Sequence, residues 1–311
     1  MGGGIVTGLS NMQVYFIHIY HMPTMPKHHP LKGVRILSLC LNLPGPAALW
    51  RCRQLGARCS KVEPPAGDPM QTYEPQAYAE LHEGIDVLTL DLKSSAGQAR
   101  LAKTLAHTDV LLTSFRPSAL RKLGLAWAPL HRQYPQLCQV AIVGGPGAQA
   151  EIPGHDLTYQ AEHDLLPGLE LPASLYADMG GALLASEAVL GVVVQRQRLS
   201  RGGYQEVALS QAAAWLAAPR RWGLTQPHGT VGGAHAGYRI YPCLDGRVAL
   251  AALEPHFARA LCVAIGLAPE AAQAMQAPAT HAAVAAFMAR QTRQALEQLA
   301  RERDLPLHTL P

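Results

Sequence analysis

Two residues whose types suit proton transfer stand out in this sequence, His155 and Asp178. His155 follows Pro153 and Gly154 and directly precedes a segment with the pattern of a helix. An imidazole titrates near neutral pH and so suits a general base, although a histidine in a loop is more often a solvated or hydrogen-bonded residue. Asp178 stands just before Gly180 and a long apolar helix. An aspartate there commonly caps the helix, and the free N–H groups of the same turn can also stabilise a developing negative oxygen.

The elements that must position these residues alternate between strands and helices. Helical patterns follow the first predicted strand up to residue 56 and the third predicted strand at 96–106, and a long apolar helix is predicted at 180–198. Such alternation predicts an α/β fold, a Rossmann-like and mostly parallel sheet covered by helices. No G-x-G-x-x-G follows the first strand, which argues against an ordinary dinucleotide site. The predicted strands lie at 34–39, 58–63, 87–90, 109–112, 139–143 and 205–209.

The character of the sequence changes after residue 222. Residues 229–237 are rich in glycine and histidine, and two short apolar runs flank a turn at Asp245 and Gly246, which predicts a hairpin. The Ala-rich stretch 279–303 predicts one amphipathic helix. We therefore expect an upstream-start or disordered extension at 1–25, a large domain at 26–222, a smaller α+β domain at 223–275, and a C-terminal helix at 276–311 that returns to the large domain.

Composition narrows the classes of function. The chain has 311 residues, 49% hydrophobic and 15% charged, which is typical of a folded globular protein. Its formal net charge of +4, from scattered Lys and Arg, suits a small anionic ligand better than nucleic acid. The six cysteines stand singly in apolar segments, which favours free thiols and a cytoplasmic location. The fourteen histidines show no metal-binding spacing, so a metal is not expected. Polar residues interrupt the apolar stretch at 5–22, so this stretch is not expected to cross a membrane or to act as a signal peptide.

Several segments, taken in chain order, resemble the coenzyme A transferases of family III, which also contain the α-methylacyl-CoA racemases. They are LKGVRIL at 31–37, LGA at 55–57, KVEPPAGDP at 61–69, DVL at 109–111, FRP at 115–117, LGL at 123–125 and RGGYQEV at 201–207. Each motif alone is weak, but their order along the chain is specific. Three more segments are similar to those that hold the catalytic histidine, the catalytic aspartate and a supporting glutamate in the racemase branch: GHDLTY at 154–159, ADMGG at 177–181 and LEP at 253–255.

The resemblance implies an enzyme that acts on the acyl group of a CoA thioester. CoA would enter as part of the substrate, and no permanently bound cofactor is expected. His155 and Asp178 would exchange protons with the substrate, and Glu254 would orient His155. The resemblance also implies an interlocked homodimer. Candidate contacts to the phosphates or adenosine of CoA are Arg116, Lys61 and Arg53.

Three functions, two of them reactions, remain open at this point. The first is removal and return of the α-proton of a 2-branched acyl-CoA, which His155 and Glu254 favour. The second is transfer of CoA to a carboxylic acid through an anhydride on Asp178, whose carboxylate suits both chemistries. The third possibility is a weakened or non-catalytic paralogue that binds an acyl-CoA. It is favoured by Glu83 and Asp86, which stand where the family has an Asn-Arg-x-Lys-Arg motif.

Overall fold

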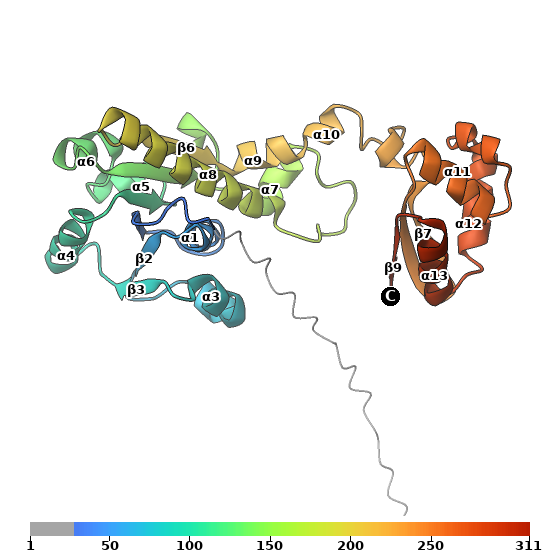
Figure 1. Ribbon diagram of the computed structural model, residues 1–311. Coiled ribbons are helices and arrows are strands. Elements are labelled where there is room, and N and C mark those ends of the chain that lie inside the picture. Colours follow the sequence, from blue (N-terminus) through green and yellow to red (C-terminus); the bar gives the residue numbers. More distant parts are fainter. Residues whose placement is uncertain (1–27) are drawn as a thin grey trace, which may run out of the picture.

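The large domain is built on a six-stranded parallel sheet (Figure 1). The structure, a computed structural model, describes residues 28–311, so the extension expected at 1–25 lies outside the described residues. The strands run in the order β3-β2-β1-β4-β5-β6, and every neighbouring pair is parallel. This is the order of a Rossmann-like sheet, and it confirms the predicted fold class. The strands are β1 (Arg35–Ser38), β2 (Arg58–Glu63), β3 (Asp86–Thr89), β4 (Val110–Thr113), β5 (Cys138–Val143) and β6 (Tyr204–Ala208).

Two hydrophobic cores cover the two faces of this sheet. Because successive strand residues point to opposite sides, Ile36 enters one core and its neighbour Leu37 enters the other. The first core is closed by α1 (Pro44–Gln54), α7 (Asp156–Glu162), α8 (Tyr176–Leu199) and α9 (Leu209–Leu216). The second is closed by α4 (Ser95–Leu105), α5 (Pro117–Lys122) and α6 (Trp127–Gln133). The remaining helices of this domain are α2 (Met70–Tyr73), α3 (Pro75–His82), α10 (Ala218–Arg221) and the 3₁₀ turn η1 (Gly147–Glu151).

Helix α8 is the long helix of the first core. By length and composition it could cross a membrane, but half of its most apolar window is buried, and it packs on α1 and α9. Small residues allow this close packing. A Cβ atom on Gly181 would lie 2.2 Å from Leu209 Cδ2, so a larger side chain there would push α9 away. The start of α8 is thereby held beside the sheet, where it contributes Asp178 to the candidate site described below.

The small domain contains a three-stranded antiparallel sheet. Strands β7 (Tyr238–Cys243) and β8 (Gly246–Ala251) form the predicted hairpin, and β9 (Leu307–Leu310) pairs with the other edge of β8. Its core lies between this sheet and α11 (Pro255–Ala264), α12 (Pro278–Met288) and α13 (Arg293–Arg303). Figure 1 shows this domain joined to the large domain by the segment that follows α10.

Two predictions for the C-terminal part of the chain are wrong. Residues 279–303 do not form one helix, because α12 ends at Met288 and the Thr292 hydroxyl accepts the N–H of Ala295 to begin α13. Nor does the tail return to the large domain, since Val284 and Leu296 are fully buried in the core of the small domain. An Ala-rich apolar pattern predicts a buried face, but it does not say which core that face joins.

Candidate active site

A cavity of about 450 Å³ opens at the carboxyl ends of the central strands. The loops after β1, β4 and β5 form its walls, together with the starts of α7 and α8. Strand order reverses between β1 and β4, and ligands of open α/β sheets bind at this switch point. Three of the predicted site residues line this cavity: His155, Asp178 and Arg116.

His155 is the N-cap residue of α7, in extended backbone conformation. Its backbone N–H donates to the hydroxyl of Thr158 at 3.1 Å, and that hydroxyl donates to the carbonyl of His155 at 2.7 Å. These reciprocal bonds hold the start of the helix while the imidazole stays exposed at the cavity. The position leaves the ring free to meet a ligand.

Asp178 lies in the first turn of α8, two residues inside the helix, so it is not the N-cap residue that the sequence pattern suggested. Its side chain lines the cavity and is half-buried. Burial and, as the smaller cause, the nearby charge of Asp156 together raise the pKa of this carboxyl from 3.8 to about 7. Asp178 is therefore partly protonated near neutral pH, as a group that both takes and returns protons must be.

Asp156 is the residue that sequence analysis missed. It follows His155 directly but turns inward and is almost completely buried. One carboxylate oxygen accepts the backbone N–H of Asp178 at 3.0 Å, and the other accepts the side-chain amide of Gln160. Asp156 thus fixes the start of α8 against α7 and places a negative charge beside Asp178. An acidic residue in the first turn of a helix is too common for its position in the sequence to reveal this role.

Tyr159 closes one side of the cavity. A Cβ atom on Gly144 would lie 2.3 Å from the phenol oxygen, and one on Gly154 would lie 2.7 Å from it. Both glycines therefore make room for the ring. Burial raises the pKa of Tyr159, and the negative charge of Asp178 raises it as well, so the phenol keeps its proton and can donate it to a ligand atom.

A second cavity, of about 610 Å³, lies beside the first. Leu41, in the loop after β1, lines both. The second cavity has mostly apolar walls, including Leu90, and the exposed lysines Lys93 and Lys122 lie among its lining residues. An elongated ligand with one end in each cavity would therefore pass over the loop after β1.

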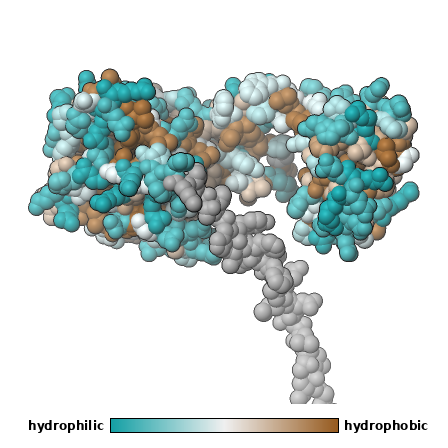
Figure 2. Space-filling model, in the orientation of Figure 1, coloured by the Kyte–Doolittle hydropathy of each residue, from teal (hydrophilic) through white to brown (hydrophobic). Residues whose placement is uncertain are grey.

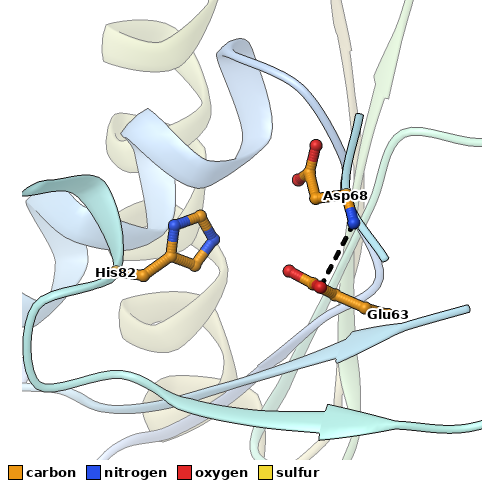
Figure 3. A group of neighbouring side chains, drawn as sticks. All are labelled: Glu63, Asp68 and His82. Carbon is orange, nitrogen blue, oxygen red and sulfur yellow. Dashed lines mark hydrogen bonds between the residues drawn. The ribbon is translucent and has the colours of Figure 1, made fainter. Parts of the chain in front are cut away.

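Lys61 was expected to contact CoA, but its position gives that role no support. Its side chain is fully buried, and its ammonium group pairs with Asp68, with Glu63 at 2.9 Å and with His82 at 2.8 Å. Figure 3 shows the three partners turned toward one another from separate segments. Among residues 28–311, Glu63, Asp68 and His82 form the one group of His, Cys, Asp and Glu side chains close enough together to bind a metal ion. The cation between them is the Lys61 ammonium group.

The other two predicted residues lie outside the first cavity. Arg53 is near the end of α1, and its guanidinium donates to the carbonyl of Gly84 at 3.2 Å. Glu254 is the exposed N-cap residue of α11 in the small domain. Neither side chain lines the cavity that holds His155 and Asp178 in this chain.

A doubly wound parallel sheet, with a histidine and a protonatable carboxylate in a cavity at its switch point, defines an α/β enzyme with acid–base groups. The sequence profile of CoA-transferase family III matches residues 31–310, and the chain belongs to that family. The fold agrees. A hypothetical protein from Mycobacterium tuberculosis superimposes with a TM-score of 0.78 at 24% identity, over 90% of this chain and 83% of its own. A CAIB/BAIF family protein from Brucella suis superimposes with a TM-score of 0.76 at 21% identity, over 92% and 85%.

Curated relatives carry the names of two different activities. A "probable fatty acyl-CoA transferase" of M. tuberculosis is 30% identical over 63% of this chain and 55% of its own length. A succinyl-CoA–D-citramalate CoA-transferase of Chloroflexus aurantiacus is 30% identical over 60% and 51%. The human alpha-methylacyl-CoA racemase is 27% identical over 76% and 65%. The chain thus spans about half to two thirds of the length of these relatives.

Proposed function

We propose that the protein binds an acyl-CoA thioester and removes and returns the proton on the carbon beside the thioester carbonyl, as in racemisation of a 2-branched acyl-CoA. One observation carries this proposal: His155 and Asp178 line one cavity, and the pKa of Asp178 is raised to about 7. Near neutral pH such a carboxyl group can return a proton as well as remove one. An imidazole ordinarily does the same in this pH range.

In the proposed reaction one of these two groups takes the α-proton. The electron pair of the C–H bond moves toward the carbonyl, and the thioester oxygen becomes negatively charged. The other group then delivers a proton to the opposite face, which restores both the C–H bond and the carbonyl. Arg116 is available to stabilise the charged oxygen, and a preorganised donor of this kind typically contributes about 3–4 kcal/mol.

The second cavity suits the nucleotide end of CoA. Its apolar walls offer a surface for the adenine ring, and Lys93 and Lys122 offer positive charge for the phosphates. In this arrangement the pantetheine chain passes Leu41, which lines both cavities. Arg116, at the first cavity, remains a candidate contact, whereas Lys61 is already neutralised by its buried partners.

Exchange in deuterated water tests the proposal. A 2-methylacyl-CoA incubated with the protein should gain deuterium at the α-carbon, with no carboxylic acid added. His155→Ala should slow this exchange by about 10²–10⁴-fold, the usual contribution of one general base. His163→Ala is the matched control, because His163 lies at the other end of α7 and does not line the cavity. Exchange that is unaffected by His155→Ala would contradict the assigned roles.

CoA transfer is the second candidate, and the same carboxylate favours it. Asp178 faces the cavity, and no group within residues 28–311 forms a hydrogen bond with its carboxylate; only its backbone N–H is bonded, to Asp156. It could therefore attack the thioester carbonyl, release CoA and form an anhydride that an acceptor acid resolves. A transferase would need that acid, would show no α-exchange, and would yield a covalent species at Asp178 that hydroxylamine traps. If neither exchange nor trapping occurs with any thioester that binds, the non-catalytic paralogue gains support.

We also propose that the working form is a homodimer in which Glu254 serves the cavity of the partner copy. Exposed apolar side chains support this: Tyr176, Met179 and Leu183 line up along α8, and Trp215 is 66% exposed on α9. Figure 2 shows hydrophobic surface gathered over the region of α9 and α10. Patches of this kind commonly mark contacts between proteins.

Subunit mixing tests this arrangement. Light scattering should give twice the chain mass. His155→Ala and Glu254→Gln, each defective alone, should regain about a quarter of the activity when unfolded and refolded together in equal amounts. About half of the dimers are then mixed, and each mixed dimer contains one intact site and one doubly altered site. A monomer mass at micromolar concentration would refute the dimer. A dimer without complementation would refute the role of Glu254.

A further inference from the structure

A buried charge network lies next to the reaction cavity, and the proposed reaction does not use it. The Lys61 ammonium group has three N–H donors, and three acceptors surround it: Asp68, Glu63 at 2.9 Å and His82 Nε2 at 2.8 Å. His82 Nδ1 lies 2.6 Å from the carbonyl of Tyr78. A carbonyl can only accept, so Nδ1 carries the hydrogen and Nε2 is free to accept from Lys61.

Asp68 connects this network to the backbone. Its side chain is fully buried and pairs with the Lys61 ammonium group. The backbone N–H of Asn42 donates to both carboxylate oxygens of Asp68, at 3.0 and 3.1 Å. The backbone N–H of Met70 donates to the same carboxylate at 3.0 Å. Asn42 has a φ of 64°, one of four positive values at non-glycine residues among 28–311. An L-residue rarely adopts this conformation without local support, and the Asp68 carboxylate provides it here.

The supported residue lies in the wall of the site. Asn42 lines the cavity that holds His155 and Asp178, and its neighbour Leu41 lines both that cavity and the second one. The Tyr73 hydroxyl reaches the side-chain oxygen of Asn42 at 3.5 Å. A change of conformation at Asn42 would therefore move the wall that separates the reacting groups from the second cavity.

We propose that Asp68 is a positioning residue of the active site, which fixes Asn42 in its left-handed conformation, and that Lys61, Glu63 and His82 hold Asp68 in place. The catalytic consequence rests on the proposed function, whereas the anchoring of the loop does not. A buried ion pair contributes little net stability compared with an apolar replacement, so the geometry that this network imposes explains its presence better than stability does.

Hydrogen exchange measured by mass spectrometry tests the anchoring without any substrate. In Asp68→Asn, amides of the peptide that covers residues 41–43 should exchange at least tenfold faster than in the unaltered chain. The matched control is Asp109→Asn, which breaks the ion pairs of the buried Asp109 carboxylate with the partly exposed Arg35 and Arg196 and should leave this peptide unchanged. Unchanged exchange in Asp68→Asn would overturn the proposal, even if the protein proves to have no activity on thioesters.

Turnover provides the second readout. Asn42→Ala disfavours a positive φ, whereas Asn42→Gly permits it, and both remove the carboxamide. Because Asn42 is exposed, both variants should fold even if Asp68→Asn does not. We expect α-proton exchange to fall about tenfold in Asn42→Ala but less than threefold in Asn42→Gly. Adding Asn42→Ala to Asp68→Asn should cost no more than about threefold further, because both changes disturb the same feature. Equal loss in the alanine and glycine variants, or fully additive losses, would refute positioning through the Asn42 backbone.

Discussion

The raised pKa of Asp178 predicts that Asp178→Asn abolishes proton return and yet stabilises the protein at alkaline pH. The pKa of this carboxyl lies at about 7 in the folded chain and ordinarily at 3.8. The folded state therefore holds a proton that the unfolded state has released between those two values, and the unaltered protein loses stability as pH rises from about 4 to 7. At about 1.4 kcal/mol per pH unit, the full effect is about 4 kcal/mol, and about 2–4 kcal/mol after allowance for water in the cavity.

Asp178→Asn cannot lose this proton, so its advantage over the unaltered chain should grow with pH. We expect a melting-temperature difference about 5–10 °C larger at pH 8.5 than at pH 4.5. All four tryptophans precede residue 223, so their fluorescence reports on the large domain. Glu187→Gln, at an exposed position on the same helix, is the control and should show no such trend. A stability difference for Asp178→Asn that stays constant within about 0.5 kcal/mol across this range would refute the reasoning.

Three further predictions follow from neighbouring groups. Asp156→Asn should lower the pKa of Asp178 and shift the pH dependence of exchange to more acidic values, because it removes the second cause of the rise. The protein should still fold, since the Oε1 of Gln160, which has no partner among residues 28–311, can accept the new amide after a flip of the Gln160 side chain. Burial and the Lys61 charge lower the pKa of His82 below 6.5, while Glu63 and Asp68 oppose this shift. The folded state therefore binds this proton less readily than the unfolded state, and the stability of the protein should fall as pH drops below 6.5. His82→Gln, whose side chain does not titrate, should flatten that loss in denaturation curves. Lys93→Ala should raise KM for an acyl-CoA several-fold with kcat nearly unchanged, and Lys103→Ala should change neither.

The parallel domain was largely predictable from hydrophobic patterns. The strand predicted at 58–63 coincides with β2, and the strand and helix pattern before Gly56 matches β1 and α1. These elements are short, apolar and punctuated by proline and glycine, so local signals define them. The break after Met288 was not predictable in the same way. Thr292 interrupts an otherwise continuous Ala-rich pattern, and its capping bond becomes evident only in the structure.

The two groups that line the cavity were predictable, but the fully buried polar groups behind them were not. His155 and Asp178 were found through a family resemblance and do line one cavity. The burial of Lys61 was not predicted, because a lysine is usually solvated. Two of its three partners, Asp68 and His82, come from segments outside its own strand β2. Periodicity reports which face of an element is buried, but it does not report which polar groups meet inside.

Asp156 and Asp178 are in contact but have different surroundings, and this difference gives them different parts in the proposed reaction. Asp156 accepts the N–H of Asp178 and the amide of Gln160, and such bonds stabilise a fixed negative charge. Asp178 is partly buried beside that charge, and burial and the charge both favour its protonated form. Since His155 and Asp156 are consecutive, one turns its ring to the cavity while the other turns inward to α8. In the proposed reaction, the start of α7 therefore supplies His155 to the cavity as a base and, from the same backbone, the Asp156 charge that favours the protonated form of Asp178.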